Sequence, residues 1–527
     1  MTPNSPTPTN PAPTPVITRR RVLVSLGVLA VGAVVAGELD LQLGAGSHPT
    51  SNGAPGASGS PGPSGPAPAA ASASQAPGAR RTFRSRPDIA APLIELTTLA
   101  GIPAAGLIFL TPANGSGHDG PTIVDGTGEL VWMHPGTGNA AADLRVATLD
   151  GQPVLTWWEG SNNAGVGVGQ HVVADSSYRV ITRIQAQNGR SADLHELLLT
   201  SRRTAVFFAA ASVGPGTVAG STTPVPKTMD WAVQEVDIAT GAVVFEWHST
   251  DHVDVAESYI SAPTAPDLVY DYFHGNSIEE DTDGNLIVSA RNTSAVYKID
   301  RSTGKILWRL GGKRSDFAMG EGATFGYQHD ARRQPDGTLT IFDDRQTAGT
   351  SRGIVLRLDE TGMTATLVRE YKQPQNLYST SQGNMQVLPS GHVFIGWGAT
   401  PRFSEFTSDG RLVLDAGFTA SQSYRDVRFP WAGTPAEAPA VAVDAGDQGV
   451  VVYASWNGST EVAAWDVLAG SGSTSLRPVA HARRTGFETV IGVTSLKPSD
   501  TTAAVRALDA SGRVLGTSPG VALPTPG

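Results

Sequence analysis

The sequence predicts an all-β protein, built as a six-bladed β-propeller followed by a small β-sandwich. Three observations predict it. Tight-turn signals recur through the middle of the chain, chemically useful side chains recur at a constant spacing, and the residues after about 430 alternate apolar and polar between turns. A chain of 527 residues is also too long for one ordinary core unless its architecture repeats.

Composition narrows the classes of partner. The chain has 38 basic and 48 acidic residues and a net charge of -10, which disfavours nucleic acid and anionic membrane surfaces as general partners. An anionic substrate therefore needs a local cationic site. The chain has no cysteine, which excludes disulfides, thiolate catalysis and a thiolate-bound metal.

The first 45 residues predict an export signal or a membrane anchor rather than part of the fold. Arg19, Arg20 and Arg21 precede an apolar run over 22–36 that is too short and too glycine-rich for a comfortable membrane span. The arginines resemble a twin-arginine signal, which exports proteins that have already folded. If the run is not cleaved, it tethers the protein to the membrane. Residues 46–88, rich in Pro, Gly, Ser and Ala, predict a disordered stalk.

Two turn signals predict repeated four-stranded sheets over about residues 89–428. In the first, Asp-Gly or Ser-Gly precedes an apolar strand, because glycine reaches the positive φ that a tight hairpin needs. In the second, a large apolar residue stands four positions after a turn glycine, where we expect it to pack against the neighbouring blade. The first signal occurs at Gly151, Gly284, Gly337 and Gly391, and the second joins Gly128 to Trp132, Gly241 to Phe245, Gly304 to Trp308 and Gly410 to Leu414.

Spacing supports the repeat. His274 lies 55 residues before His329, and His329 lies 55 before Asn384. A region of about 330 residues at roughly 55 per blade gives six blades. His195 lies 79 residues before His274, and a Gly/Pro/Thr-rich insertion over 214–228 accounts for much of the excess. These residues precede their turns by six to nine positions, which predicts that they start innermost strands and line one central channel.

Three histidines and one arginine near strand starts predict an oxyanion site. They are His195 in DLHELLLT, His274 in YFHGNSIEED, Arg291 in VSARNTSAV and His329 in YQHDARRQPDG. A neutral imidazole is a competent nucleophile near pH 7, and His329 is placed for that role. The fixed fork of donors on Arg291 suits a tetrahedral anion. Asp343 and Asp344 either orient His329 or cap a turn.

Metal and nucleotide chemistry fit the sequence less well. Three histidines also suit zinc, but no carboxylate stands at ligand spacing from them, and an arginine in the same pocket would repel the cation. The only glycine-lysine element, over residues 311–314, lacks the upstream glycine and the following Ser or Thr of a phosphate loop. We expect neither a metal nor another cofactor.

Residues 429–527 predict a fibronectin type III-like β-sandwich. Alternating segments such as VVVYASWNGSTEVAAWDVL suit a small antiparallel sandwich, with Trp456 and Trp465 as core candidates. We assign this domain no chemistry, and expect it to space, attach or cap the propeller.

The set H…HxN…R…QH, the Asp-Gly hairpins and the opening GLIFLTP…GPTIVDGTGELVW resemble the bacterial arylsulfotransferase family over about Leu93 to Phe418. The resemblance implies a six-bladed propeller that moves a sulfuryl group from a phenolic sulfate ester to a phenolic acceptor without the nucleotide donor PAPS. It also implies a transiently sulfurylated histidine. The chain differs from the best-known periplasmic members, because it has no cysteine pair and carries its sandwich at the C-terminus.

The resemblance also assigns roles to residues. His329 matches the nucleophile, and Arg291 the arginine that holds sulfuryl oxygens. His274 and His195 match histidines that contact sulfuryl or phenolic oxygens, and either one acts as general acid and then base. Asn276, in the HxN element, and Asn384, in the comparable segment of the next repeat, are expected to bind substrate.

Two other classes remain open at this stage. The Thr-Gly…Trp turns also resemble those of quinoprotein dehydrogenases, which bind pyrroloquinoline quinone, although the adjacent cysteine pair often seen there is absent. Alternatively, the chain is a non-catalytic extracellular propeller that binds a glycan or a protein.

Overall fold

The computed structural model describes residues 79–524, except 114–119, 135–138, 217, 222–224, 226, 266, 346–348 and 448. In this part the chain is all-β, as predicted, with one short helix, α1 (Ser249–His252), and one 3-10 turn, η1 (Val255–Glu257). No helix of the described part is long and apolar enough to cross a membrane. The predicted export signal or anchor, residues 1–45, and residues 46–78 of the predicted stalk lie outside the described residues.

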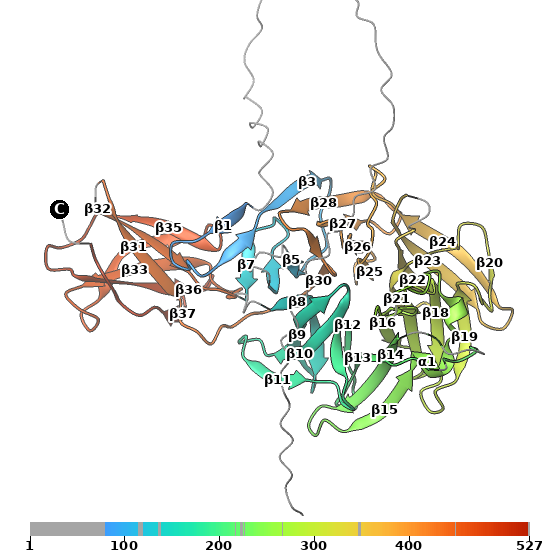
Figure 1. The fold of residues 1–527 in the computed structure, drawn as a ribbon. Helices are drawn as coiled ribbons and strands as arrows, with labels where there is room; N and C mark the ends of the chain where they lie inside the picture. Colours follow the sequence, from blue (N-terminus) through green and yellow to red (C-terminus); the bar gives the residue numbers. More distant parts are fainter. Residues whose placement is uncertain are drawn as a thin grey trace, which may run out of the picture. The chain divides into compact units, whose positions relative to one another are not determined.

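Residues 94–429 form a succession of sheets (Figure 1). The first sheet has the order β30 (Val427–Phe429), β4 (Leu107–Leu110), β6 (Thr122–Val124) and β7 (Leu130–Met133). A small sheet pairs β5 (Pro112–Ala113) with β29 (Gln422–Ser423). An eight-stranded sheet follows, comprising β8 (Ala140–Leu149), β9 (Gln152–Asn163), β10 (Val166–Ala174), β11 (Val180–Ile184), β12 (Ser191–Leu199), β13 (Thr204–Val213), β14 (Thr228–Asp237) and β15 (Val243–His248).

Three more sheets complete this region. One consists of β16 (Gly275–Glu280), β17 (Leu286–Ala290), β18 (Ala295–Ile299) and β19 (Ile306–Gly311). The next consists of β21 (His329–Arg333), β22 (Leu339–Asp343), β23 (Arg352–Asp359) and β24 (Thr364–Tyr371), with β20 (Ala318–Met319) at its edge. The last consists of β25 (Asn384–Val387), β26 (Val393–Gly396), β27 (Arg402–Phe406) and β28 (Leu412–Phe418), with β3 (Ile94–Leu99) at its edge.

The turn glycines behave as the sequence predicts. All eight have φ between +72° and +92°, the left-handed region that glycine enters without a Cβ clash. Of the large residues that follow four positions later, Trp132, Trp308 and Leu414 are buried, and Phe245 packs against a core cluster from its edge. The turn chemistry therefore sets the strand boundaries.

The core lies between successive sheets, and its contacts form a closed circuit. Five core clusters each unite side chains of two neighbouring sheets, and a sixth unites the two halves of the eight-stranded sheet, β8–β11 and β12–β15. One of the five joins the last sheet to the first. Representative pairs are Trp132 with Trp157, Val173 with Phe207, Trp231 with Tyr297, Trp308 with Ile341, Phe342 with Ile395, and Phe394 with Ile108. Burial of large apolar side chains between faces, rather than any single core, stabilises this region.

The two ends of this region meet in the first sheet. Strand β30 comes from the C-terminal side and pairs with β4, so that Val427 faces Phe109 and Phe429 faces Leu107. At the other edge of the succession, β3 pairs with β28. The sheets are therefore tied together by segments about 320 positions apart in the sequence.

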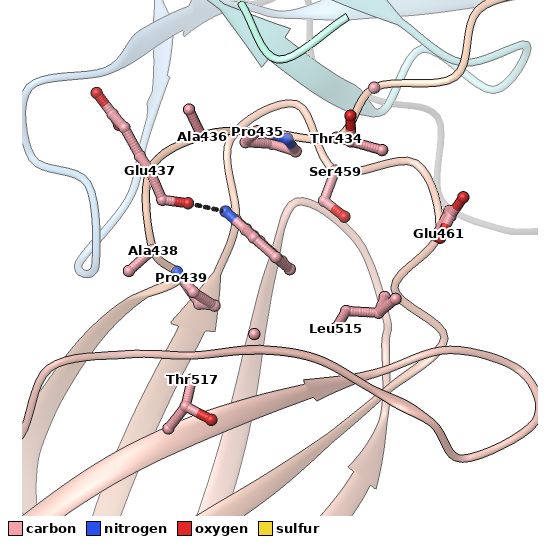
Figure 2. A pocket seen from close by; sticks show the side chains of 13 residues that line it. Thr434, Pro435, Ala436, Glu437, Ala438, Pro439, Ser459, Glu461, Leu515 and Thr517 are labelled. Atoms are coloured by element: carbon pink, nitrogen blue, oxygen red, sulfur yellow. Dashed lines mark hydrogen bonds between the residues drawn. The ribbon is translucent and has the colours of Figure 1, made fainter.

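Residues beyond 439 form two sheets that share one core. The first contains β31 (Ala440–Gly446), β32 (Gly449–Ser455) and β35 (Glu488–Val493), and the second contains β33 (Ala464–Gly470), β34 (Arg477–Arg483), β36 (Thr502–Leu508), β37 (Val514–Thr517) and β38 (Val521–Ala522). Trp465 is a fully buried core residue, as predicted. Trp456 is half-buried, and its indole N–H donates to the Glu437 carbonyl at 2.7 Å. Glu437 lines a cavity of about 390 Å³ (Figure 2).

Order begins earlier than the stalk prediction allows. Residues 46–88 were expected to be disordered, yet β1 (Arg80–Thr82) pairs with β2 (Ala90–Pro92). Between the strands, the Phe83 ring lies 4.4 Å from that of Phe487. Phe83 and Ile89 belong to a buried cluster with Leu130, Met133 and Phe487, which orders a segment whose composition alone suggests a linker.

Candidate active site

Four of the predicted site residues lie within, at the start of or directly before strands β12, β16, β21 and β25. His195 is in β12, His274 directly precedes β16, and His329 begins β21. Register shifts, the mark of β-bulges, occur around His195 in the middle of β12 and at the starts of β16 and β21. A bulge turns a side chain out of the regular alternation, which lets these residues face one another.

The three histidines come together around a buried tyrosine. The His195 ring lies 5.0 Å from His274 and 5.1 Å from Tyr424, and His329 lies 6.5 Å from Tyr424 (ring centroids). These residues come from separate sheets and span some 230 positions of sequence. The structure thus places imidazoles that are far apart in the sequence close together.

Each imidazole is anchored through Nδ1 by an aspartate. His195 bonds Asp193 at 2.5 Å, His274 bonds Asp271 at 2.5 Å, and His329 bonds Asp344 at 2.7 Å. Such a partner fixes both the ring orientation and the tautomer. The Nε2 edge of each ring is thereby left for other contacts.

The environment of His329 keeps its imidazole neutral. Nδ1 donates to Asp344, and Nε2 accepts a hydrogen bond from the Gln382 backbone N–H at 3.2 Å. Burial, with the nearby charge of Arg291, holds the pKa of His329 well below its usual value. Burial raises the pKa of Asp344, and Arg291 opposes that rise. The outcome is a buried ring with an unprotonated Nε2.

The two adjacent carboxylates have separate partners. Asp344 holds His329, whereas Asp343 bonds the guanidinium of Arg352 at 2.9 Å. Of the two readings the sequence left open, orientation of His329 therefore holds for Asp344 only.

Arg291 supplies a positive charge beside the histidines. Its backbone N–H donates to the His274 carbonyl at 2.9 Å, and its guanidinium lies 5.0 Å from the Tyr327 ring and bonds the Asn292 side chain. No Asp or Glu of the described residues forms an ion pair with it, in contrast to most arginines of the inner strands. The charge remains available to an anion.

The two asparagines differ. Asn276 is fully buried, its amide N–H₂ donates to the Gln328 carbonyl at 2.6 Å, and its Oδ1 has no partner among the described residues. The amide of Asn384 instead bonds both the carbonyl and the N–H of Asp426, at 2.8 Å and 2.9 Å. Asn384 thus holds the start of β30, and its predicted contact with substrate stays a prediction.

The sequence analysis did not identify Tyr424 and Arg425, which contact the histidine cluster and its neighbour Asn276. The hydroxyl of buried Tyr424 donates to the Asn276 carbonyl at 3.0 Å, and Arg425 donates to the same oxygen at 2.8 Å. The Arg425 guanidinium lies 4.9 Å from the Tyr424 ring. The aspartates could have been found, because Asp193 stands two positions and Asp271 three positions before its histidine.

A set of paired charges lies next to the site residues along the chain and toward the C-terminal end of β21. Buried Glu196 bonds Arg332 at 2.5 Å and Arg425 at 3.3 Å, and it also pairs with Arg145. Arg425 reaches Asp143 at 3.0 Å. A cavity of about 260 Å³ lies beyond these groups, lined in part by Arg332 and Arg425. Nearly every charge in this set has a partner of opposite sign.

The arrangement suits group transfer to or from an oxyanion: an unprotonated imidazole, an arginine without a carboxylate partner, and two further imidazoles with anchored tautomers. In the part of the chain that the structure describes, no cluster of three or more His, Cys, Asp or Glu side chains is disposed to hold a metal ion.

Comparison with known families agrees with this class. The chain matches the arylsulfotransferase (ASST) family over residues 145–419, more than half of its length, and it belongs to that family. The matched region contains all the predicted site residues and stops short of Tyr424. Family membership supports aryl sulfotransferase activity, with an aryl sulfate donor and a phenolic acceptor.

The individual proteins that resemble the chain are only distantly similar to it. No curated protein matches the chain. Among solved structures, a Bacteroides caccae protein of unknown function is 15% identical, with a TM-score of 0.38, covering 61% of this chain and 98% of that one. A streptogramin B lyase is 12% identical, with a TM-score of 0.29, covering 77% and 94%. A Staphylococcus aureus virginiamycin B lyase is 11% identical, with a TM-score of 0.30, covering 68% and 95%. With TM-scores below 0.5, these likenesses establish neither fold nor activity.

Proposed function

We propose that the protein is a PAPS-independent aryl sulfotransferase that moves a sulfuryl group from a phenolic sulfate ester to a phenolic acceptor through a sulfohistidine on His329. One observation carries the proposal. His329 presents an unprotonated Nε2 within a site that also contains Arg291, while Asp344 holds its Nδ1 proton. Nucleophile, tautomer anchor and anion-binding charge are thus assembled in one place.

In the first half-reaction, Nε2 of His329 attacks the sulfur, and the bond between sulfur and the aryl oxygen breaks. The N–S bond gives the ring a positive charge, which the hydrogen bond from Nδ1 to Asp344 stabilises. Arg291 holds the sulfuryl oxygens. Sulfuryl transfer resembles phosphoryl transfer in its loose transition state, so positioning and electrostatics supply most of the rate. In the second half-reaction the acceptor oxygen attacks sulfur, the N–S bond breaks, and kinetics are ping-pong.

We assign the general acid and base role to His274. Burial lowers the pKa of His195, which disfavours this ring as the general acid. Burial by itself would raise the pKa of Asp271, but the charge and hydrogen bond of His274, helped by Trp231, lower it overall. Asp271, which bonds Nδ1 of His274 at 2.5 Å, orients the ring so that Nε2 gives a proton to the leaving phenolate and then takes the proton of the acceptor phenol.

We propose that residues 89–428 form a six-bladed propeller with the site at its axis. The closed circuit of core clusters and the joining of β30 to β4 support six four-stranded units, with the eight-stranded sheet counted as two. We further propose that residues 429–527 form a fibronectin type III-like sandwich, an assignment that the shared core of the two C-terminal sheets supports.

We propose that the protein acts outside the cytoplasm, after export by residues 1–45, either free or tethered by that segment, with residues 46–78 as a spacer. The support is the run of arginines before an apolar stretch and the lack of cysteine.

Release of 4-nitrophenol from 4-nitrophenyl sulfate, with phenol as acceptor, tests the function. We expect His329→Ala to lower the rate at least about 10³-fold. His171→Ala is the matched control, because His171 is also a buried imidazole, but it lies in β10 against Phe207. Equal losses in the two variants, or release that is independent of phenol, would contradict the proposal.

A further inference from the structure

A long hairpin reaches from the eight-stranded sheet to the histidine cluster. Strands β9 and β10 pair from Trp158 outward to a two-residue turn at Ala164 and Gly165. Residues 161–163 of β9 extend past the end of β8, which stops pairing at Gly160. We call residues 160–169 the hairpin arm. Its turn residues have φ of 53° and 90°, the conformation of a type I′ turn.

The tip of the hairpin arm lies against the working edge of His274. A Cβ atom placed on Gly165 would stand 3.2 Å from Cε1 and 3.8 Å from Nε2 of His274. Since Nδ1 is occupied by Asp271, the Cε1–Nε2 edge is the side of this ring that can meet a substrate. Gly165 therefore borders the space in which a phenolic oxygen and the first atoms of its ring must sit.

The hairpin arm is held firmly in this position. The Gly167 N–H donates to Oδ2 of Asp193 at 2.6 Å, while Oδ1 of the same carboxylate holds His195. Glycines on the arm pack directly on the Trp158 ring, where a Cβ at Gly160 or Gly169 would come within 2.7 Å. An arm without room for side chains on this face, and tied to a site carboxylate, acts as a fixed wall.

Beyond the turn the arm faces solvent. The side chains of Asn162, Asn163 and Ala164 are exposed. An aryl group that leaves the cluster along the arm therefore passes one glycine and then reaches open surface.

We propose that the hairpin arm is the side wall of the aryl subsite at His274, and that the missing side chain of Gly165 sets the largest phenol that the site accepts. The inference rests on the proposed function for the identity of the ligand as a phenol. Gly165 is a specificity-determining residue in this proposal, since it offers space rather than a reacting group.

The experiment compares Gly165→Ala with Gly151→Ala. Gly151 also has a positive φ, +74°, but no atom lies within 4 Å of its Cβ position, so its variant reproduces the backbone strain without the steric contact. Gly165→Asn is a second variant, since asparagine tolerates the left-handed conformation best among larger residues. Thermal unfolding verifies that each variant is folded.

The measurement is kcat/KM for phenol and for 2-naphthol as acceptors, with 4-nitrophenyl sulfate as donor. We expect Gly165→Ala and Gly165→Asn to lower the 2-naphthol value about tenfold more than the phenol value, the range of one crowded apolar contact. Gly151→Ala should leave the ratio unchanged. A ratio that is the same in all variants overturns the proposal.

Calorimetric binding of phenol and 2-naphthol separates this proposal from the proposed function. If the wild-type protein transfers no sulfuryl group, the proposed function fails. The wall is then supported by a Kd ratio that shifts about tenfold in the Gly165 variants only, and overturned by a ratio that does not shift.

Discussion

Two neighbouring groups of buried polar residues use the same residue types for opposite purposes. In the histidine cluster, three imidazoles are anchored by aspartates on Nδ1, and Arg291 has no carboxylate partner among the described residues. In the second group, Glu196 and Arg425 belong to a network of ion pairs. The difference teaches that burial of polar groups alone does not mark a site. The site is distinguished by imidazoles that aspartates orient through Nδ1 and by an arginine without a carboxylate partner among the described residues.

The largest expected effect comes from breaking the ion-pair network around Arg425. Replacing Arg425 with Met leaves Asp143 and Glu196 buried with one fewer positive partner, and removing one member of a buried ion pair costs about 3–5 kcal/mol. We expect a loss of that size in the free energy of unfolding by urea denaturation. Arg513→Met, at an exposed pair with Asp509, should change it by less than about 0.5 kcal/mol. Equal effects of the two changes would refute the contrast.

A smaller effect, on kcat, is expected at the histidine cluster, where the adjacent aspartates Asp343 and Asp344 hold different partners. Asp344→Asn removes the carboxylate that holds His329, so we expect kcat to fall about 10- to 100-fold with little change in KM. Asp343→Asn instead weakens the hold on Arg352, and we expect it to reduce thermal stability while kcat of the folded enzyme stays near wild type. The assignment fails if Asp343→Asn lowers kcat as strongly.

The smallest expected effect is on the pH dependence of stability, and it concerns His171, a buried histidine without an aspartate partner. His171 is buried, its Nε2 has no partner among the described residues, and burial lowers its pKa to about 3. The unfolded chain binds this proton near pH 6.5 and the folded chain does not, so stability falls as the pH drops from 6.5 toward 3. Between pH 7 and 5.5 we expect His171 to account for about 1 kcal/mol of that loss.

His171→Phe should therefore flatten the fall in unfolding free energy over this range, measured by urea denaturation at each pH. His481→Phe, at an exposed histidine bonded to Asp466, is the matched control. A slope that His171→Phe leaves as steep as in wild type would show that the ring is not held neutral.

Much of the site could be predicted because the repeat leaves a trace in the sequence. The 55-residue spacing located His274, His329 and Asn384, and the turn glycines located the strands on which they lie. Tyr424 and Arg425 left no such trace, since they precede β30, a strand whose partners in the first sheet lie more than 300 positions earlier. The hydrogen bond from the Gln382 N–H to His329 and the approach of Gly165 to His274 depend on backbone position, which residue type does not predict.

The pairing of β30 with β4 has a consequence for the order in which the chain can fold. Residues 107–133 are made early, but their inner partner is not available until Phe429 has been synthesised. Tyr424, which supports the histidines, arrives in the same few residues. Completion of the sheets formed by residues 94–429 and completion of the site are thus one late event. A nascent or truncated chain that stops before this point has its histidines and no assembled place in which to use them.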